Sequence, residues 1–331
     1  MNALLSVIIL NWNGRNVMEK FLPSVVANTD GEEVEVIVAD NGSTDDSVEW
    51  LKAAYPSLRI IEFKENFGFA GGYDRAIRMV ESPYVLLLNS DVETPPGWWQ
   101  PLLEFMVSHP EAGAIQPKIL SFRDKTRFEH AGAAGGLLDK LGYPYARGRV
   151  LGSVEKDCGQ YDSADAVKVA WASGAAMLVS KKAYEKSGGF DTLFFAHMEE
   201  IDLCWRMMLK GYFIYALTKV CVYHYGGGAL PYGNPRKTYL NFRNNLLMLY
   251  KNLPVKDGRK FLIKRRLADT IAFFFFLLKG NLNDAKAVVK AHEDYRKLKN
   301  KYTVFPENNI MKEIPGTQRS IFFMTHAKKN K

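Results

Sequence analysis

The sequence predicts an α/β fold in which helices flank a sheet of parallel strands. Short apolar runs alternate with helix-length segments through the first 90 residues, beginning and ending with a strand. Parallel strands joined by right-handed helical crossovers are the simplest architecture for this alternation. The central run, Tyr84 to Val92, begins with five consecutive apolar residues and ends in a polar tip. This pattern is typical of a strand that is buried on both faces.

The predicted elements follow in order along the chain. Strands are predicted at 5–11, 34–39, 59–63, 84–88, 115–120, 175–179 and 220–224. Helices are predicted at 17–27, after the turn at 40–43, in the segment ending near 80, after 95–96, from 181 and over 199–209. Residues 121–165 are rich in glycine, and their apolar residues recur with neither the helical nor the strand period. We therefore expect an irregular loop that covers the substrate.

Length and composition indicate a globular protein. The chain has 331 residues, of which 47% are apolar and 24% are charged. Its three cysteines have no paired spacing, which argues against a disulfide framework or a zinc site and fits a reducing compartment. No positively charged segment precedes the apolar run at 4–10, so we expect a first strand there and not a signal peptide. The expected location is therefore the cytoplasm.

The net charge of +8 is divided unevenly along the chain. Residues 1–235 carry 22 basic and 29 acidic side chains, whereas residues 236–331 carry 22 basic and 7 acidic ones. We therefore expect one domain at 1–235 and a basic extension at 236–331, with helices near 238–251, 257–279 and 283–301. The basic charge indicates an anionic partner. Because the chain has no nucleic-acid recognition motif, we expect a membrane surface and no nucleic acid. The alternative is a solvated tail that binds no partner.

The second helix of the extension contains an apolar run, Ile271 to Leu278, that follows the basic residues Lys264, Arg265 and Arg266. Eight residues are far fewer than the roughly 20 that span a bilayer. Basic and aromatic residues together suit a helix that lies at the inner face of an anionic membrane. The alternative is a helix that docks on the catalytic domain or on a second subunit, which would make a homodimer.

Three polar groups lie where predicted strands end, which is where open α/β sheets bind ligands. Asn89, Ser90 and Asp91 follow the central strand, and one carboxylate with an amide can hold a Mg²⁺ ion that substrate phosphates already bridge. Asp40 follows a second strand and His224 follows a third. The alternatives are turn chemistry for the two aspartate segments and a structural role for the histidine.

Two further segments could take part in a site. The glycine-rich loop from Gly68 to Gly72 opens a helix and can bring backbone N–H groups to a phosphate, although it is neither a dinucleotide fingerprint nor a P-loop. Glu199, Glu200 and Asp202 lie at the start of a helix. They either complement the helix dipole or supply a general base at the mouth of the sheet.

These motifs, with their order and spacing, resemble those of the family 2 glycosyltransferases, and the rhamnosyltransferase-like branch looks nearest. The resemblance covers about residues 4–250. The matching segments are Asn11-Trp12-Asn13-Gly14, Val38-Ala39-Asp40-Asn41-Gly42-Ser43-Thr44-Asp45, Asn66-x-Gly68-Phe69-Ala70-Gly71-Gly72, Leu88-Asn89-Ser90-Asp91-Val92, Ser173-Gly174-Ala175-Ala176-Met177-Leu178, Gly188-Gly189-Phe190-Asp191, Glu199-Glu200-Ile201-Asp202-Leu203-Cys204-Trp205-Arg206 and His224.

The resemblance implies a GT-A fold, with a nucleotide-binding half at 1–110 and an acceptor half at 111–235. It implies inverting transfer from a nucleotide-diphosphate sugar (dTDP-rhamnose or a UDP-sugar), with Mg²⁺ or Mn²⁺ as cofactor. The implied acceptor is a glycan or a lipid-linked saccharide in cell-surface polysaccharide synthesis. The alternatives are a sugar-1-phosphate nucleotidyltransferase, whose glycine-rich, arginine-containing first loop is missing here, and an inactive carbohydrate- or nucleotide-binding module.

The resemblance also implies roles for single residues. The implied nucleotide-binding residues are Asn11, Asn13, Asp40, Asn66 and Gly71, the donor-sugar residues are Ser173 and Gly174, and the metal ligands are Asp91, His224 and Asn89. Two positions depart from the family pattern: Asn89 replaces the first acid of the Asp-x-Asp motif, and Glu200 follows Glu199 where an aspartate is usual. We expect Glu200 to be the base because it borders the buried face of its helix, with Asp202 as the alternative.

Overall fold

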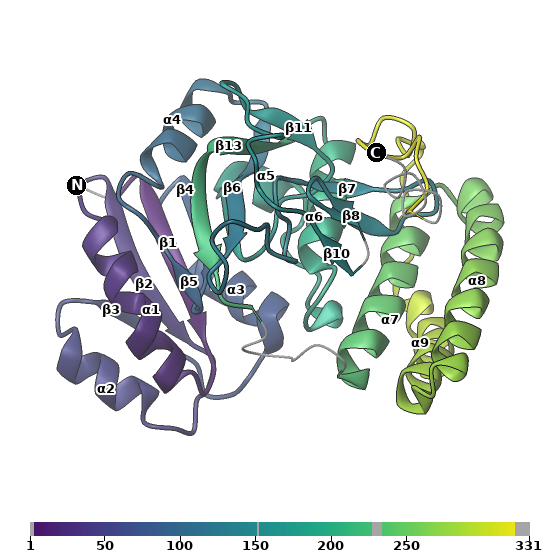
Figure 1. The fold of residues 1–331 in the computed structure, drawn as a ribbon, viewed down its shortest axis with the longest axis horizontal. Helices are drawn as coiled ribbons and strands as arrows, with labels where there is room; N and C mark the ends of the chain where they lie inside the picture. The colour runs from purple at the N-terminus through teal and green to yellow at the C-terminus, as the bar shows by residue number, and fades with distance from the viewer. Residues whose placement is uncertain (1–2, 151, 227–233, 322–331) are drawn as a thin grey trace.

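The protein is described by a computed structural model that covers residues 3–150, 152–226 and 234–321. Its centre is a nine-stranded sheet with the order β11-β13-β6-β12-β4-β1-β2-β3, to which β5 adds by pairing with β13 (Figure 1). The strands are β1 (Leu5–Asn11), β2 (Val34–Asp40), β3 (Arg59–Glu62), β4 (Tyr84–Asn89), β5 (Val92–Glu93), β6 (Ala112–Ser121), β11 (Val167–Val169), β12 (Ala176–Ser180) and β13 (Phe213–His224).

The first four main strands are parallel, as the alternation of strands and helices predicts. The sheet as a whole is mixed, because β12 runs antiparallel to both β4 and β6. β4 lies between β1 and β12, so its polar tip is at the middle of the sheet edge. β13 is longer than the predicted strand at 220–224 and pairs with β6 along most of its length.

Helices cover both faces of this sheet (Figure 1). On one face, α3 (Gly68–Arg78), α5 (Lys181–Lys186) and α6 (Glu199–Leu209) contribute to one hydrophobic core. On the other face, α1 (Arg15–Asn28), α2 (Ser47–Ala54) and α4 (Gln100–Ser108) contribute to a second core. Side chains of β4 alternate between the two cores, with Leu87 in the first and Leu88 in the second. The central strand is therefore buried on both faces, as its composition predicts.

Residues 121–165 are more ordered than the sequence indicates. They contain a small antiparallel sheet of β7 (Gly136–Leu138), β8 (Pro144–Ala146), β9 (Arg149–Val150) and β10 (Ser153–Val154). The strands have two or three residues each, too few for an alternating pattern to be visible in the sequence. Phe128 lies in a small core beneath this sheet with Ala133, Ala134 and Ala146. The prediction of an irregular loop was wrong for this segment.

The basic extension forms the helices α7 (Pro235–Asn252), α8 (Val255–Leu278) and α9 (Leu282–Leu298), on the side of the molecule opposite β1–β3 (Figure 1). α7 packs against both α6 and α9. The chain then returns to the small sheet, where the Leu138 N–H donates to the Pro315 carbonyl at 3.2 Å and the Lys140 N–H donates to the Arg319 carbonyl at 2.8 Å. Across the described ranges, every helix is too short or too polar to cross a bilayer.

Candidate active site

Asp40 and Asn11 lie side by side because they end the paired strands β2 and β1. The Asn11 amide donates to Asp40 Oδ1 at 2.9 Å, and Ser43 donates its backbone N–H to Oδ2 at 2.9 Å and its hydroxyl to Oδ1 at 2.6 Å. The turn chemistry offered as an alternative is thus present, and it holds the buried carboxylate in place. Asn11 Oδ1 is buried and has no hydrogen-bond partner in the described part of the chain, so it remains able to accept one.

The other three predicted nucleotide-binding residues surround this pair. Asn13 Oδ1 accepts from the Thr44 N–H at 2.7 Å, which ties the two turns together. Asn66 Oδ1 accepts from the Gly68 N–H at 2.8 Å and so stabilises the entry to α3. Gly71 lies in the first turn of α3, where an added Cβ would come within 2.9 Å of the Phe67 side chain. The structure therefore brings the five residues to one end of β1, β2 and α3.

A buried chain of three ionisable groups lies at the tip of β4. His224 Nε2 is 3.0 Å from Asp91 Oδ1, and His224 Nδ1 is 3.0 Å from Glu129 Oε2. The Asn89 amide is 3.3 Å from His224 Nε2, and the Gly226 N–H donates to Asp91 Oδ2 at 3.1 Å. The predicted metal residues are therefore in direct contact with one another. Glu129 has no counterpart among the predicted residues.

The two carboxylates control the charge of this imidazole. Burial by itself lowers the pKa of His224, but Asp91 and Glu129 outweigh it and raise that pKa to about 10. Burial likewise raises the pKa of Glu129, but the contact with His224 lowers it to about 2. These two contacts therefore favour the protonated form of His224.

The same donors fit a divalent ion. A histidine that binds a metal usually donates its other ring N–H to a carboxylate, as His224 Nδ1 can do with Glu129. An ion bound at Nε2 would have to displace the proton that Nε2 shares with Asp91. Within residues 3–150, 152–226 and 234–321, no three His, Cys, Asp or Glu side chains are grouped as a complete ion site. A bound ion would therefore need further ligands from substrate phosphates, as Mg²⁺ commonly does.

The Ser173-Gly174 turn lies beside the same tip. The Asn89 N–H donates to the Ala175 carbonyl at 3.0 Å, which joins the turn to the end of β4. The Ser173 N–H donates to Gln116 Oε1 at 2.9 Å, and Ser173 itself is buried. At Gly174 an added Cβ would come within 2.8 Å of the Phe69 ring, so a larger residue does not fit without movement of Phe69. The predicted donor-sugar residues are thus next to the predicted metal residues.

Glu199 and Glu200 begin α6, and neither is paired with a cation in the described part of the chain. Glu200 Oε2 is buried without a hydrogen-bond partner there. Burial raises the pKa of Glu200 to about 7, although backbone N–H groups at the start of the helix partly oppose the shift. Burial and the neighbouring Glu200 raise the pKa of Glu199 well above its ordinary value. Glu200 therefore has the proton affinity of a useful base near neutral pH.

Asp202 has a different environment. Its Oδ2 is 2.9 Å from Arg206 Nε and 3.0 Å from Lys251 Nζ, and its Oδ1 accepts from the Asn252 amide at 2.8 Å. Burial raises its pKa, but the two cations outweigh that effect and the pKa is lowered. Both oxygens of Asp202 therefore join α6 to α7, which leaves this carboxylate a poor proton acceptor.

The loop before α6 connects the two halves of the site. The Phe195 carbonyl accepts from the Ala70 N–H at 3.1 Å, and an added Cβ on Gly68, whose φ is +73°, would approach that carbonyl within 2.6 Å. Phe195, His197 and Met198 all have positive φ, at 64°, 68° and 73°, which is uncommon for residues other than glycine. Such strain persists only where surrounding contacts enforce it.

Asn244, on α7, supplies those contacts. Its buried amide donates to the carbonyls of Phe194, Ala196 and His197 at 2.9, 2.9 and 2.7 Å. The neighbouring Arg243 donates to the carbonyls of Leu193 and Phe194 at 3.1 and 3.0 Å. A helix of the basic extension therefore fixes the loop that presents Glu200. Sequence reasoning missed Arg243, Asn244 and Glu129, because no family motif or local period marks them.

Comparisons with known proteins identify the family of this chain. Residues 6–184 match the family described as Glycosyl transferase family 2. The chain is 28% identical over 227 residues to the N-acetylglucosaminyl-diphospho-decaprenol L-rhamnosyltransferase of Mycobacterium tuberculosis, covering 64% of this chain and 73% of the relative.

Two solved structures have the same fold. GalNAc-T7, crystallised with UDP, GalNAc and Mn²⁺, superposes with a TM-score of 0.60 at 13% identity, covering 77% of this chain and 49% of the other. TarS of S. aureus (residues 1–349, with UDP-GlcNAc) superposes with a TM-score of 0.58 at 17% identity, covering 89% and 80% of the two chains. The mixed sheet, its flanking helices and the C-terminal helices thus form a GT-A fold with a helical extension. This chain is a glycosyltransferase and belongs to glycosyl transferase family 2.

Proposed function

We propose that the enzyme transfers a sugar, with inversion, from a nucleotide-diphosphate donor to a lipid-linked saccharide during cell-surface polysaccharide synthesis. The proposed donor is dTDP-rhamnose or a UDP-sugar. The rhamnosyltransferase relative supports the first donor and the lipid-linked acceptor, since its name states both the sugar and a diphospho-decaprenol acceptor. The 28% identity to that relative is the reason for keeping a UDP-sugar as the second donor.

The observation that carries this proposal is the contrast between two carboxylates. Asp91 is ion-paired with His224, whereas Glu200 has no cation partner among the described side chains and a pKa raised by burial to about 7. Carboxylates whose environments differ in this way commonly divide the work of charge stabilisation and proton transfer. We assign Asp91 to the diphosphate end of the donor and Glu200 to the acceptor.

The reaction follows from these assignments. The acceptor hydroxyl gives its proton to Glu200 while its oxygen forms a bond to the anomeric carbon of the donor sugar. The bond between that carbon and the diphosphate oxygen breaks on the opposite side, and the nucleoside diphosphate leaves with the electron pair. One in-line displacement inverts the anomeric configuration. Asp202 positions α6 in this scheme and takes no proton.

On the donor side, we propose that Asp40 and Asn11 contact the base, with Asn13, Asn66 and Gly71 forming the surrounding wall. The unpartnered Asn11 Oδ1 supports this assignment, since it can accept an N–H of a pyrimidine base. Ser173 and Gly174 would line the sugar. Asp91, His224 and Asn89 would hold Mg²⁺ or Mn²⁺ together with the diphosphate, and the ion would supply charge neutralisation for the leaving group.

We further propose that residues 1–235 are the catalytic unit, divided near residue 110, and that residues 236–331 support it through Asn244. A lipid-linked acceptor lies at a membrane, so the proposed location is the cytoplasmic face of the cell membrane. The second role proposed for the extension is the formation of a homodimer.

The test is a donor and acceptor screen with the purified full chain. Thermal shift is measured with dTDP-rhamnose, UDP-GlcNAc, UDP-galactose and GDP-mannose, each with Mn²⁺, Mg²⁺ or EDTA, because a ligand that binds only the folded state raises its stability. The stabilising donor is then incubated with a short-chain GlcNAc-diphospho-lipid, and the product is identified by mass and by anomeric NMR. We expect one donor to bind with metal and to give an inverted product. A retained configuration, or transfer unaffected by EDTA, would contradict the proposal.

A further inference from the structure

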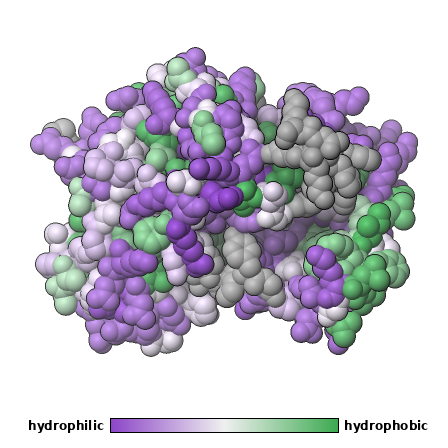
Figure 2. Space-filling model, viewed as in Figure 1, coloured by the Kyte–Doolittle hydropathy of each residue, from purple (hydrophilic) through white to green (hydrophobic). Residues whose placement is uncertain are grey.

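The long helix α8 presents an apolar face to the outside of the molecule. Six of its apolar side chains are between 52% and 89% exposed. They recur three or four positions apart, so they form one stripe along the helix. We call this surface the α8 stripe; its residues are Ile263, Leu267, Ile271, Phe274, Phe275 and Leu278. Figure 2 shows hydrophobic side chains gathered at the edge of the molecule where Figure 1 places α8.

The opposite face of α8 is held against the protein by charged side chains. Arg265 and Asp269 are almost fully buried and form an ion pair at 2.9 Å. Asp269 also accepts from the Tyr143 hydroxyl at 2.8 Å and lies 3.1 Å from His292 Nε2. An ordinary surface helix buries its apolar face and exposes its charges. In α8 an ion pair is buried beside Leu262 and Ala268 while six apolar side chains are exposed, and the buried polar contacts fix the helix in this orientation.

Lysines lie on the same face as the α8 stripe. Lys260 is three residues before Ile263 and Lys264 is three residues before Leu267, so each lysine lies next to a residue of the α8 stripe on the same face of the helix. Both lysines are exposed. From residue 259 to residue 278 the sole acidic residue is Asp269, which is buried. The exposed face of α8 over this length is therefore apolar and basic.

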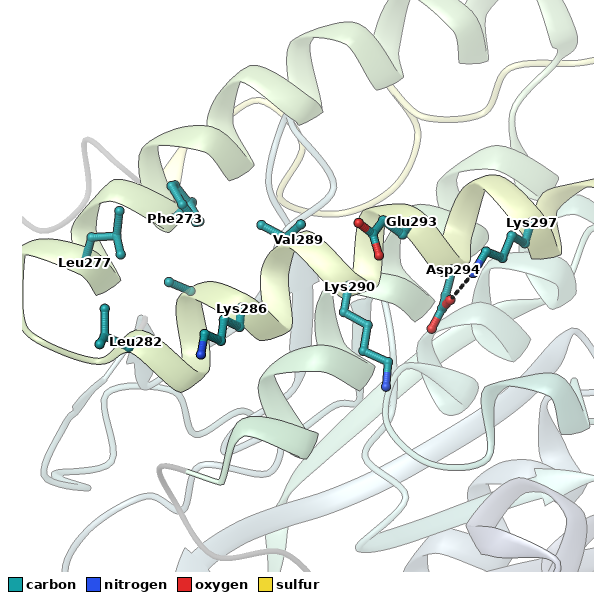
Figure 3. Close-up of a pocket in the computed structure, with 10 residues that line it drawn as sticks. Phe273, Leu277, Leu282, Lys286, Val289, Lys290, Glu293, Asp294 and Lys297 are labelled. Carbon is teal, nitrogen blue, oxygen red and sulfur yellow. Dashed lines mark ion pairs between the residues drawn. The ribbon is translucent and has the colours of Figure 1, made fainter.

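The groove between α8 and α9 differs in charge from the α8 stripe (Figure 3). It has a volume of about 510 Å³, and Phe273 and Leu277 of α8 face α9 across it. Lys286 and Lys290 extend from α9 away from α8. Farther along α9 the groove is lined by Glu293 and Asp294 as well as by Lys297, so its charges are of both signs. Because its charge differs, the groove can serve as a control surface for the α8 stripe.

We propose that the α8 stripe and its lysines bind the surface of a membrane that contains anionic phospholipid. The apolar side chains would enter the boundary between headgroups and acyl chains, and the lysines would reach the lipid phosphates. A second copy of the chain is a poorer occupant, because a two-fold interface would bring the same basic face of both copies together. The biological purpose rests on the proposed lipid-linked acceptor, but the binding itself does not.

The test is flotation of the full chain with vesicles. Phosphatidylcholine vesicles are compared with vesicles that also contain phosphatidylglycerol, at low and high salt. We expect binding to the anionic vesicles at low salt and weaker binding at high salt. Phe274→Gln with Phe275→Gln, and separately Lys260→Glu with Lys264→Glu, should each lower the partition coefficient about tenfold or more. These side chains are exposed, so both variants should keep the wild-type circular dichroism and melting temperature.

The control is Lys286→Glu with Lys290→Glu on α9, which makes the same change in net charge at the groove. We expect its partition coefficient to stay within about threefold of the wild-type value, since its lysines lie off the α8 stripe. Absence of binding to anionic vesicles at low salt, or an equal loss in this control, overturns the proposal. A wild-type dimer that the Phe274→Gln, Phe275→Gln variant converts to a monomer assigns the surface to a second copy and also overturns it.

Transfer to a water-soluble GlcNAc glycoside separates this inference from the proposed function. All the α8 variants should keep the wild-type rate with that acceptor. A wild-type enzyme that binds vesicles but transfers no sugar to any acceptor refutes the proposed function and leaves the membrane surface standing. An enzyme that transfers sugar but does not bind anionic vesicles refutes the membrane surface and leaves the proposed function standing.

Discussion

Replacing Glu200 with glutamine should inactivate the enzyme and stabilise its fold. Glutamine keeps the size of the side chain but cannot take a proton, so turnover should fall by roughly 10²–10⁴ with little change in donor affinity. Burial without a cation partner makes the ionised Glu200 unfavourable in the folded state, which is why its pKa is raised to about 7 from 4.5. A residue with only a structural role would lose stability on the same change.

The sign and size of the stability effect follow from that pKa. A raised pKa means that the folded protein holds the proton more tightly than the unfolded chain does, so the contribution to stability is favourable below pH 4.5 and is lost as the pH rises through about 7. At about pH 8 the ionised carboxylate therefore destabilises the fold. Each pKa unit corresponds to about 1.4 kcal/mol, so the change from 4.5 to about 7 sets an upper value of about 3–4 kcal/mol for the gain in Glu200→Gln.

Two measurements check this prediction. Urea unfolding at about pH 8 should show a higher free energy of unfolding for Glu200→Gln than for the wild type, and the difference should shrink at about pH 5. Wild-type turnover should fall as the pH drops below about 7, because the base becomes protonated. The matched control is Glu49→Gln, an exposed acid in the first turn of α2, which should leave turnover unchanged and alter stability by less than about 0.5 kcal/mol.

Two results would refute the assignment of the base. The first is a Glu200→Gln enzyme with near-normal turnover while Asp202→Asn is inactive and normally folded, which would make Asp202 the base. The second is a Glu200→Gln enzyme that is less stable than the wild type at about pH 8. In that case the carboxylate would be making favourable contacts in the folded protein, contrary to its unpartnered Oε2.

The remaining predictions concern the support of Glu200 and the tip of β4. Asn244→Ala removes three hydrogen bonds to buried carbonyls, so the free energy of unfolding should fall by about 3 kcal/mol and kcat should drop more than KM changes. Asn241→Ala, which loses one hydrogen bond within α7, is the control and should leave kcat unchanged. An equal loss of kcat in both variants would contradict the role of Asn244 in supporting the loop before Glu200. Asp91→Asn should abolish metal-dependent transfer, and transfer that keeps the wild-type rate and metal dependence would contradict its role as a ligand.

The strands and helices of the first half were predictable from the sequence because they depend on local chemistry. The apolar run at β4 and the polar residues that follow it can be read from neighbouring positions alone. The ends of parallel strands meet at one edge of a sheet, so the placement of Asp40 and the tip of β4 at the same edge was also predictable. Residues 121–165 were not, since strands of two or three residues leave no period and are held by pairing with one another.

The sequence by itself determined the fold class, the family and the positions of the motif residues. Tertiary structure decided which of those residues are paired and which are left without a partner. His224 finds Glu129 across 95 residues, and Asn244 finds the strained loop before α6 across some 50 residues. The buried ion pair of α8 also depends on distant contacts, because Asp269 has Tyr143 and His292 as partners in addition to Arg265. Contacts over such separations depend on how complete elements pack, and the local pattern of residues carries no record of them.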